Sequence, residues 1–308
     1  MKSGGMGGKK IREKVSEYIA ALTSQGTARN TVLSYGRDLY QMADYLDAQN
    51  ITKTGQVDEL VLQAYMRRMS SEQKRPATIA RAAASMKAFY RYLAQSGVIV
   101  RSPAEQLKAP KVEKGIPYIL SQEEVVRLLQ QPKGTSPKAV RDRAMLELLY
   151  ATGIRVSELI DIQIDDVNLN MEYLLCRQGK KERVIPFGQA AKHSLTDYLE
   201  NARPLLVKDP ACTNLFTNLS GQKMSRQGFW KLLKQYAHHA GIEGEITPHT
   251  LRHSFAAHLV NNGADLYAVQ EMMGYADLSA AQVYARMHHV SVREVYTKTH
   301  PREMSKEQ

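Results

Sequence analysis

The chain has 308 residues, which is enough for two domains that each bury a core of their own. Its hydrophobic content of 43% is ordinary for a globular protein, and no apolar run approaches the length needed to cross a bilayer. The formal net charge is +11, of which residues 1–108 carry +8 (17 basic, 9 acidic) and residues 109–308 carry +3 (25 basic, 22 acidic). Such an excess is typical of a nucleic-acid-binding surface or of a solvated basic face, and charge alone does not choose between them.

Residues 1–8 are rich in glycine, and we expect a flexible leader without a role in the fold. The two cysteines, Cys176 and Cys212, have neither metal-ligand spacing nor a secretory context. They therefore predict a reducing, cytoplasmic location and no metal site.

The first domain is predicted to span residues 9–101 and to be a small bundle of amphipathic helices. Four stretches have the apolar spacing of helices: 11–22, 32–46, 58–69 and 79–93. Seven basic side chains gather around the last stretch, with Glu72 as the one acid among them: Arg67, Arg68, Lys74, Arg75, Arg81, Lys87 and Arg91. A basic side of the bundle would suit a DNA backbone, where each neutralised phosphate adds salt-sensitive affinity.

Residues 102–118 contain three prolines and alternating charges, which predicts an extended linker. The second domain, 119–308, shows these signals in chain order: a capping box at Ser121 and Glu124, a helix from Ser136-Pro137 to Gly153, strands at 173–177 and 183–187 around a basic turn, and helices after Leu195. The expected fold is mainly α, an N-terminal helical bundle plus a mostly helical α+β domain with a small antiparallel sheet. No glycine-rich phosphate loop occurs, so we expect no nucleotide cofactor.

Four separated segments of the second domain carry residues suited to phosphate chemistry. They are TGIRVSEL (152–159) with Arg155, the hairpin pair Lys180 and Lys181, PHTLRHSFAAHL (248–259) with His249 and Arg252, and MMGYADLSAAQVYARM (272–287) with Tyr275 and Tyr284. Each residue alone has an ordinary structural explanation, because an arginine after a helix end often binds carbonyls and lysines at a hairpin tip are usually solvated.

In this order and spacing, the four segments resemble the tyrosine recombinase (phage integrase-type) family. TARNTVLSYGRDLYQMADYL (27–46) is similar to the core-binding domain of that family, and the HPRE sequence at 300–303, without an arm-binding domain ahead, is most similar to the XerC/XerD subgroup. The resemblance covers residues 9–303. It implies a C-shaped clamp on double-stranded DNA at a specific recombination site, four protomers holding two such sites, and neither metal nor cofactor. It also allows a second related recombinase and a DNA translocase activator as partners.

The resemblance also implies a role for each residue. Arg155 and Arg252 would clamp the scissile phosphate, because guanidinium forks match its oxygens. Tyr284 would be the nucleophile that forms a 3′-phosphotyrosyl link, which conserves the bond energy for rejoining. Lys180 would act as general acid and His249 would assist proton transfer. Glu158, one turn after Arg155, would orient the site.

Two positions depart from the family pattern. Gly274-Tyr275 stands where the family usually has Gly-His or Gly-Trp, and a phenol can still donate a hydrogen bond to a phosphate oxygen. The hairpin is about one residue short, so counting back from Arg183 puts Gln178 at the lysine position, whereas counting forward from Arg155 favours Lys180, with Lys181 next. The remaining histidines are expected to pack or to face solvent: His238, His239, His253 and His258.

The sequence leaves two other functions open. A protein of the same fold could bind or bridge DNA without recombining it, if the changes at Tyr275 and the hairpin weaken catalysis. A helix-turn-helix regulator would explain the basic first domain, but it would not explain the arginines, lysine, histidine and tyrosine of the second.

Overall fold

The computed structural model describes residues 10–111, 117–178, 181–275 and 277–285. The chain divides into two compact units, residues 1–115 and 116–308, and each has its own buried core. No helix among the described residues is both long and apolar enough to span a bilayer.

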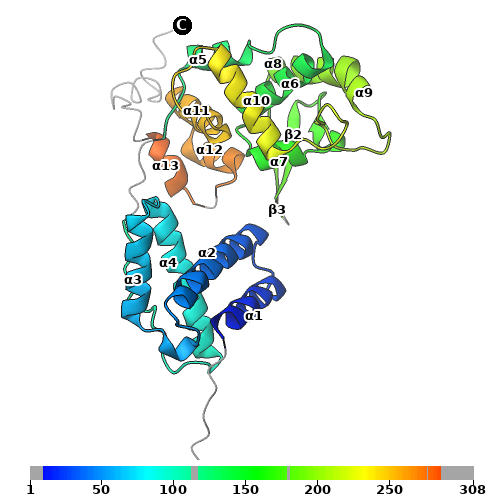
Figure 1. Cartoon of the computed structure of the whole chain (residues 1–308). Helices are drawn as coiled ribbons and strands as arrows, with labels where there is room; N and C mark the ends of the chain where they lie inside the picture. The colour runs from blue at the N-terminus through cyan, green and yellow to red at the C-terminus, as the bar shows by residue number, and fades with distance from the viewer. Residues whose placement is uncertain (1–9, 112–116, 179–180, 276, 286–308) are drawn as a thin grey trace, which may run out of the picture. The chain divides into compact units, whose positions relative to one another are not determined.

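The first unit is built from four helices, drawn from blue to cyan in Figure 1: α1 (Ile11–Ser24), α2 (Arg29–Ala48), α3 (Glu59–Ser71) and α4 (Pro76–Gln95). Asp58 caps α3 by accepting a hydrogen bond from the backbone of Val61 at 2.9 Å, and Pro76 occupies the first turn of α4. The predicted apolar stripe of α4 is buried from Ile79 to Leu93. The predicted helical bundle is confirmed.

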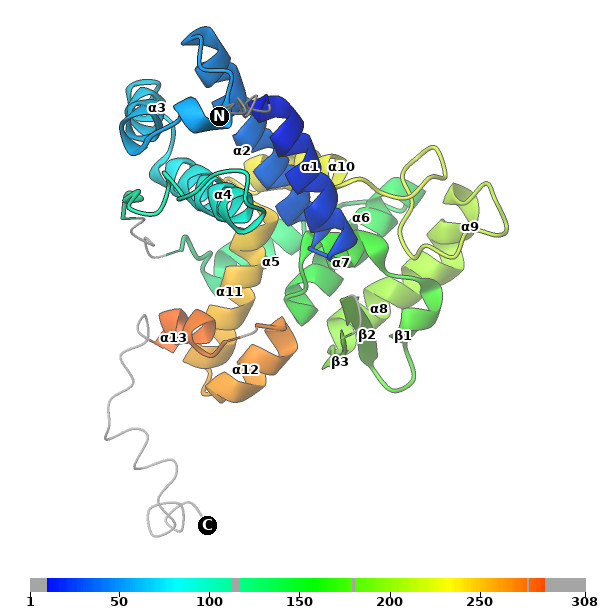
Figure 2. The ribbon, with the colours of Figure 1, turned by 90° about the horizontal axis from the view of Figure 1, so that it is seen from below.

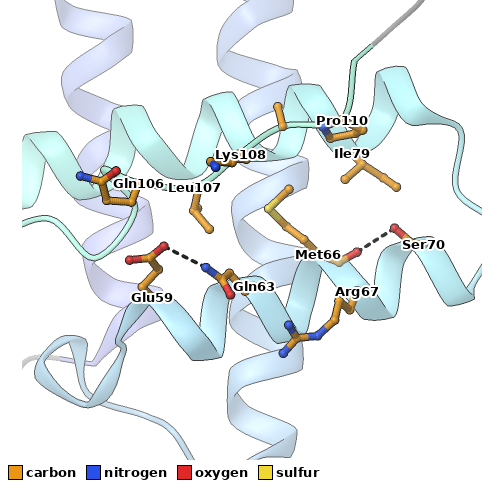
Figure 3. Close-up of a pocket in the computed structure, with 11 residues that line it drawn as sticks. Glu59, Gln63, Met66, Arg67, Ser70, Ile79, Gln106, Leu107, Lys108 and Pro110 are labelled. Atoms are coloured by element: carbon orange, nitrogen blue, oxygen red, sulfur yellow. Dashed lines mark hydrogen bonds between the residues drawn. The ribbon is translucent and has the colours of Figure 1, made fainter.

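A hollow of about 670 Å³ lies on this first unit, between α3, α4 and residues 106–110 (Figure 3). Its polar walls include Arg67 and Lys108 and the hydrogen-bonded pair Glu59 and Gln63. None of the residues expected to be catalytic lines it, so the catalytic chemistry must be sought in the second unit.

The second unit contains a three-stranded antiparallel sheet in the order β1-β2-β3, surrounded by helices. Its elements are α5 (Gln122–Leu129), α6 (Pro137–Thr152), α7 (Val156–Asp161), β1 (Val167–Asn168), β2 (Tyr173–Gln178), β3 (Lys181–Pro186), α8 (Gln189–Asp197), α9 (Arg203–Leu206), α10 (Arg226–His239), α11 (Pro248–Asn261), α12 (Leu266–Met273) and α13 (Ser279–Ala285). The capping box at Ser121 and Glu124 and the helix from Pro137 to a left-handed Gly153 are both present.

Two details of the second unit differ from the sequence predictions. The hairpin strands reach Gln178 and Lys181, because the facing pair Arg177 and Glu182 forms a cross-strand ion pair of 3.2 Å that extends the ladder. Residues 207–224 are not helical, although helices were expected throughout this region. The Asn218 side chain accepts hydrogen bonds from the backbone there and forms a turn instead.

A small apolar cluster joins α11, α12 and α13, which pack side by side in Figures 1 and 2. Phe255 of α11, Met273 of α12 and Tyr284 of α13 are all buried in it. Thr247 caps α11 and Pro248 occupies its first turn, as predicted. This cluster holds the end of α13 against α11, which places Tyr284 beside the histidines of α11.

Candidate active site

Arg252 is deeply buried for a charged side chain, with 3% of its surface exposed. Its guanidinium donates hydrogen bonds to the carbonyl oxygens of Gly153 and Met273 and lies 5.1 Å from the centre of the Tyr275 ring. Gly153 has φ +58°, and a Cβ there would come within 2.2 Å of Phe255. Only glycine lets the chain turn so close to α11 and present its carbonyl to the arginine.

The C-terminal end of α12 binds three arginines through three successive carbonyl groups. Arg183 donates to Met272 at 3.0 Å, Arg252 donates to Met273, and Arg155 donates to Gly274 at 3.3 Å. Unpaired carbonyls at the end of a helix carry partial negative charge and favour cations there. The helix end therefore brings the two proposed phosphate-binding arginines together.

Glu158 holds Arg155 and Arg183 from the other side. It accepts hydrogen bonds from the Arg155 backbone at 2.7 Å and side chain at 3.0 Å, and from both terminal nitrogens of Arg183 at 3.0 and 2.9 Å. Burial by itself would raise the pKa of Glu158, but the hydrogen bonds from Arg183 and Arg155 outweigh it and hold the pKa below its usual range. A charged Glu158 thus holds the side chain of Arg155 in place.

Two side chains reach the Tyr284 hydroxyl, and Tyr284 itself is only 1% exposed. The Tyr275 hydroxyl lies 3.0 Å from it and His253 Nδ1 lies 2.6 Å from it. Burial raises the pKa of Tyr284 well above its ordinary value. The phenol is therefore protonated at neutral pH.

His249 lies one turn before His253 on α11, with the two rings 6.3 Å apart, and much of its surface is exposed. Its pKa is lowered, first by the desolvation of the ring and then by the charges of Arg252 and Arg155. His249 is thus neutral near pH 7 in the absence of a bound anion.

The structure brings Arg155, Arg252, Tyr275 and Tyr284 into one network, with His249 at its edge. Lys180 lies outside the described residues, and for Lys181 only the backbone position in β3 is described. Within the described ranges, no group of three or more histidine, cysteine or acidic side chains could hold a metal ion.

Two residues of this network had no role in the sequence analysis. Arg183 was used only to align the hairpin with the family pattern. His253 was expected to pack or to face solvent. The sequence did hold a signal for His253, because four residues separate it from His249 and put both on one face of a helix.

Residues 119–289 match the phage integrase family, and residues 15–97 match the N-terminal SAM-like domain of phage integrases. A tyrosine recombinase XerD of Halalkalibacterium halodurans is 43% identical over 286 residues, which cover 90% of this chain and 94% of the relative. The chain belongs to the phage integrase family. A tyrosine recombinase XerD of Listeria monocytogenes is 41% identical over 297 residues, or 95% of this chain and 100% of the relative.

Solved structures of a site-specific recombinase and of an integrase share the fold. The XerH site-specific recombinase bound to palindromic difH substrate matches with a TM-score of 0.75 at 19% identity, over 93% of this chain and 84% of that one. A lambda integrase tetramer bound to a Holliday junction matches with a TM-score of 0.72 at 18% identity, over 91% of this chain and 78% of that one. At these identities the likeness concerns the fold alone.

Proposed function

We propose that this phage integrase family member is a site-specific DNA recombinase that cuts and rejoins strands through a 3′-phosphotyrosyl intermediate. One observation carries the proposal: Arg252 contacts the ring of Tyr275, and the Tyr275 hydroxyl contacts Tyr284. This chain of contacts puts a cation that can bind phosphate beside a buried phenol that can attack it.

Each residue of the site has its own role in strand cleavage. Arg155 and Arg252 bind the non-bridging oxygens of the scissile phosphate, where negative charge grows during attack. The α12 carbonyls and Glu158 already hold both side chains, so little reorganisation is needed when DNA binds. The Tyr284 oxygen forms the bond to phosphorus, and the 5′ oxygen leaves. By family resemblance Lys180 protonates that leaving oxygen and His249 assists proton transfer.

The substrate is double-stranded DNA at a specific recombination site, and the working assembly is a tetramer on two such sites. A relative of the same fold, lambda integrase, has been solved as a tetramer bound to a Holliday junction, which supports this assembly. The relatives named XerD favour chromosome-dimer resolution over the integration or excision of a mobile element. A second related recombinase and a DNA translocase are the proposed partners, and the cytoplasm is the proposed location.

A second candidate is a weakened recombinase that binds or bridges DNA without cutting it. The residue type at position 275 favours this alternative, because a phenol stands where the family usually has histidine or tryptophan. A phenol cannot supply the positive charge of an imidazolium.

Covalent trapping separates the two functions. The protein first selects its site from a library of random duplexes, and the selected duplex is remade with nicks at successive positions. Cleavage beside a nick releases a short fragment with a 5′-hydroxyl, so the phosphotyrosyl adduct accumulates. We expect an adduct that maps to Tyr284 by mass spectrometry and disappears in Tyr284→Phe. Binding of the selected duplex without any adduct would support the weakened protein instead.

A further inference from the structure

His253 has the shortest contact with the proposed nucleophile. Its Nδ1 lies 2.6 Å from the Tyr284 hydroxyl, and the two ring centres are 5.9 Å apart. The contact is held in place because α11 and α13 pack together through the apolar cluster that contains Phe255. In the described part of the chain, the hydrogen bonds of the Tyr284 hydroxyl run to His253 and Tyr275.

The protons of these three groups fit one arrangement. A neutral histidine with its proton on Nε2 accepts at Nδ1, and in that tautomer Tyr284 donates to His253 while Tyr275 donates to Tyr284. Desolvation lowers the pKa of His253, and the nearby His249 and Arg252 lower it further. A neutral base therefore faces a protonated phenol, and that phenol must lose its proton to become a good nucleophile.

We propose that His253 is a further catalytic residue, which accepts the Tyr284 proton as the phenol oxygen attacks the scissile phosphate. The proposal rests on the assignment of Tyr284 as nucleophile under the proposed function. The bond between the Tyr284 oxygen and phosphorus forms, the bond from phosphorus to the 5′ oxygen breaks, and the phenol proton moves to His253 Nδ1. The 5′ oxygen takes its proton from a separate acid. In rejoining, His253 returns the proton to the departing phenolate.

The charges around His253 make this transfer depend on bound DNA. His249 and Arg252 face it from α11, Tyr284 faces it from α13, and Tyr275 reaches Tyr284 from the end of α12. Without an anion, Arg252 opposes a second positive charge on His253. A phosphate bound between the arginines offsets that opposition, so the base acts when substrate is present.

The first test compares single-turnover adduct formation in the wild-type chain and in His253→Asn. Asparagine can keep a hydrogen-bond acceptor near the Nδ1 position, but it cannot take a proton. We expect the rate to fall by roughly 10²–10⁴, as for the loss of a general base, with binding of the selected duplex unchanged. His239→Asn, which replaces an exposed histidine of α10, is the matched control and should react at the wild-type rate.

The second test makes the nucleophilic phenol itself more acidic. A trifluorotyrosine at position 284 is a stronger acid than tyrosine in the same surroundings and so depends less on a base. We expect it to raise the rate of adduct formation in His253→Asn, and to weaken the acid-side fall in rate that protonation of His253 causes in the wild-type chain. A role of His253 in positioning alone predicts no such rescue, because fluorination restores no contact.

Different results would overturn Tyr284 as the nucleophile and His253 as its base. An adduct that persists in Tyr284→Phe would show that Tyr284 is not the nucleophile and would overturn the proposed assignment. An adduct on Tyr284 that forms at the wild-type rate in His253→Asn would overturn the role of His253 alone. If His253→Asn fails to bind DNA, the test is the pH dependence of adduct formation in the trifluorotyrosine chain with His253 intact. A fall in rate at low pH that is the same as in the wild-type chain would overturn the role of His253.

Discussion

Tyr275 combines two contacts that a histidine at the same position would make differently. Its ring lies against Arg252, while its hydroxyl lies 3.0 Å from Tyr284. We propose that the same hydroxyl turns to a phosphate oxygen when DNA is bound and stabilises the charge that develops there. Tyr275 would then hold the nucleophile at rest and stabilise the transition state during cleavage.

We predict that Tyr275→Phe slows adduct formation by roughly 10²–10³, as for the removal of one oxyanion-type donor. Tyr275→His should restore or raise cleavage relative to the wild-type chain, because an imidazolium is the stronger donor. Single-turnover rates on the selected nicked duplex measure both variants. A phenylalanine variant that cleaves as fast as the wild-type chain would show that the hydroxyl takes no part.

Gly153 shows how closely the backbone approaches α11 at the site. We predict that Gly153→Ala destabilises the second unit by roughly 1–3 kcal/mol through overpacking against Phe255, in addition to the cost of a left-handed alanine. Gly241→Ala is the matched control, since its φ of +64° is similar but no atom lies within 4 Å of the added Cβ. Equal losses of stability would contradict the proposed clash.

Trp230 makes this measurement specific, because it is the single tryptophan of the chain and lies in α10 of the second unit. Its fluorescence in a urea titration of the full chain reports the unfolding of that unit alone. The midpoint and slope then give the change in free energy of unfolding.

The resemblance of four motifs to the tyrosine recombinase family predicted Arg155, Arg252, Tyr275 and Tyr284 as site residues, and these four side chains lie in one network of contacts. It could not predict the role of His253, because 31 residues separate it from Tyr284 and the contact depends on how α13 packs. The roles of all these residues in catalysis remain predictions, as does that of Lys180, which lies outside the described residues.

Among the secondary-structure elements, α12 has the strongest influence on the site. It is a short helix, and its last carbonyls receive Arg183 from β3, Arg252 from α11 and Arg155 from the start of α7. The hairpin of β2 and β3 is tied to this helix end and to Glu158 through Arg183. Helical periodicity predicts such a helix but does not reveal which cations meet its end, because those cations come from distant parts of the chain.

We predict that Arg183→Gln makes the second unit more sensitive to acid. In the wild-type chain the pKa of Glu158 is depressed, so its stabilising contribution is present above the unfolded-state pKa of about 4.5 and is lost as pH falls through the lower folded-state pKa. Without Arg183, only Arg155 still offsets the effect of burial, so the folded-state pKa of Glu158 rises relative to the wild-type chain and the loss should begin at higher pH. Urea midpoints followed by Trp230 between about pH 7 and 3 measure the shift.

Arg177→Gln is the control for this comparison, because Arg177 lies on the same hairpin but is half exposed and pairs with Asp166 and Glu182. Its acid profile should shift less than that of Arg183→Gln. Coincident profiles for Arg183→Gln and the wild-type chain would show that Arg183 does not control the ionisation of Glu158.

Most elements were predictable from periodicity and caps, which are local signals. The four helices of the first unit, the helix that ends at Gly153 and the capped start of α11 follow from them. Residues 207–224 were not predicted, because their conformation depends on pairing with distant backbone: Leu215, for example, donates to the carbonyl of Ile162. Helical spacing alone carries no information about such contacts.

For the whole molecule, the uneven charge is the feature most directly related to its substrate. Among the described basic side chains of the first unit, some are paired with acidic side chains, and others are not. Arg81 donates to both oxygens of buried Asp38, at 2.8 and 2.7 Å, so its charge serves the fold. Arg75 and Lys87 take part in no ion pair among the described residues, and they are the better candidates for phosphate contacts.

We predict that DNA affinity falls steeply with salt and that Arg75→Glu and Lys87→Glu each weaken binding to every duplex sequence by a similar factor. A phosphate contact adds about 0.9 to the slope of log affinity against log salt, so each reversal should lower that slope by about one. Lys53→Glu makes the same charge change in the connection between α2 and α3 and serves as the control. A slope that drops equally in Lys53→Glu would mean that net charge matters and α4 does not. Equal affinity of the wild-type chain at about 50 and 300 mM salt would remove the basis for a phosphate-binding face altogether.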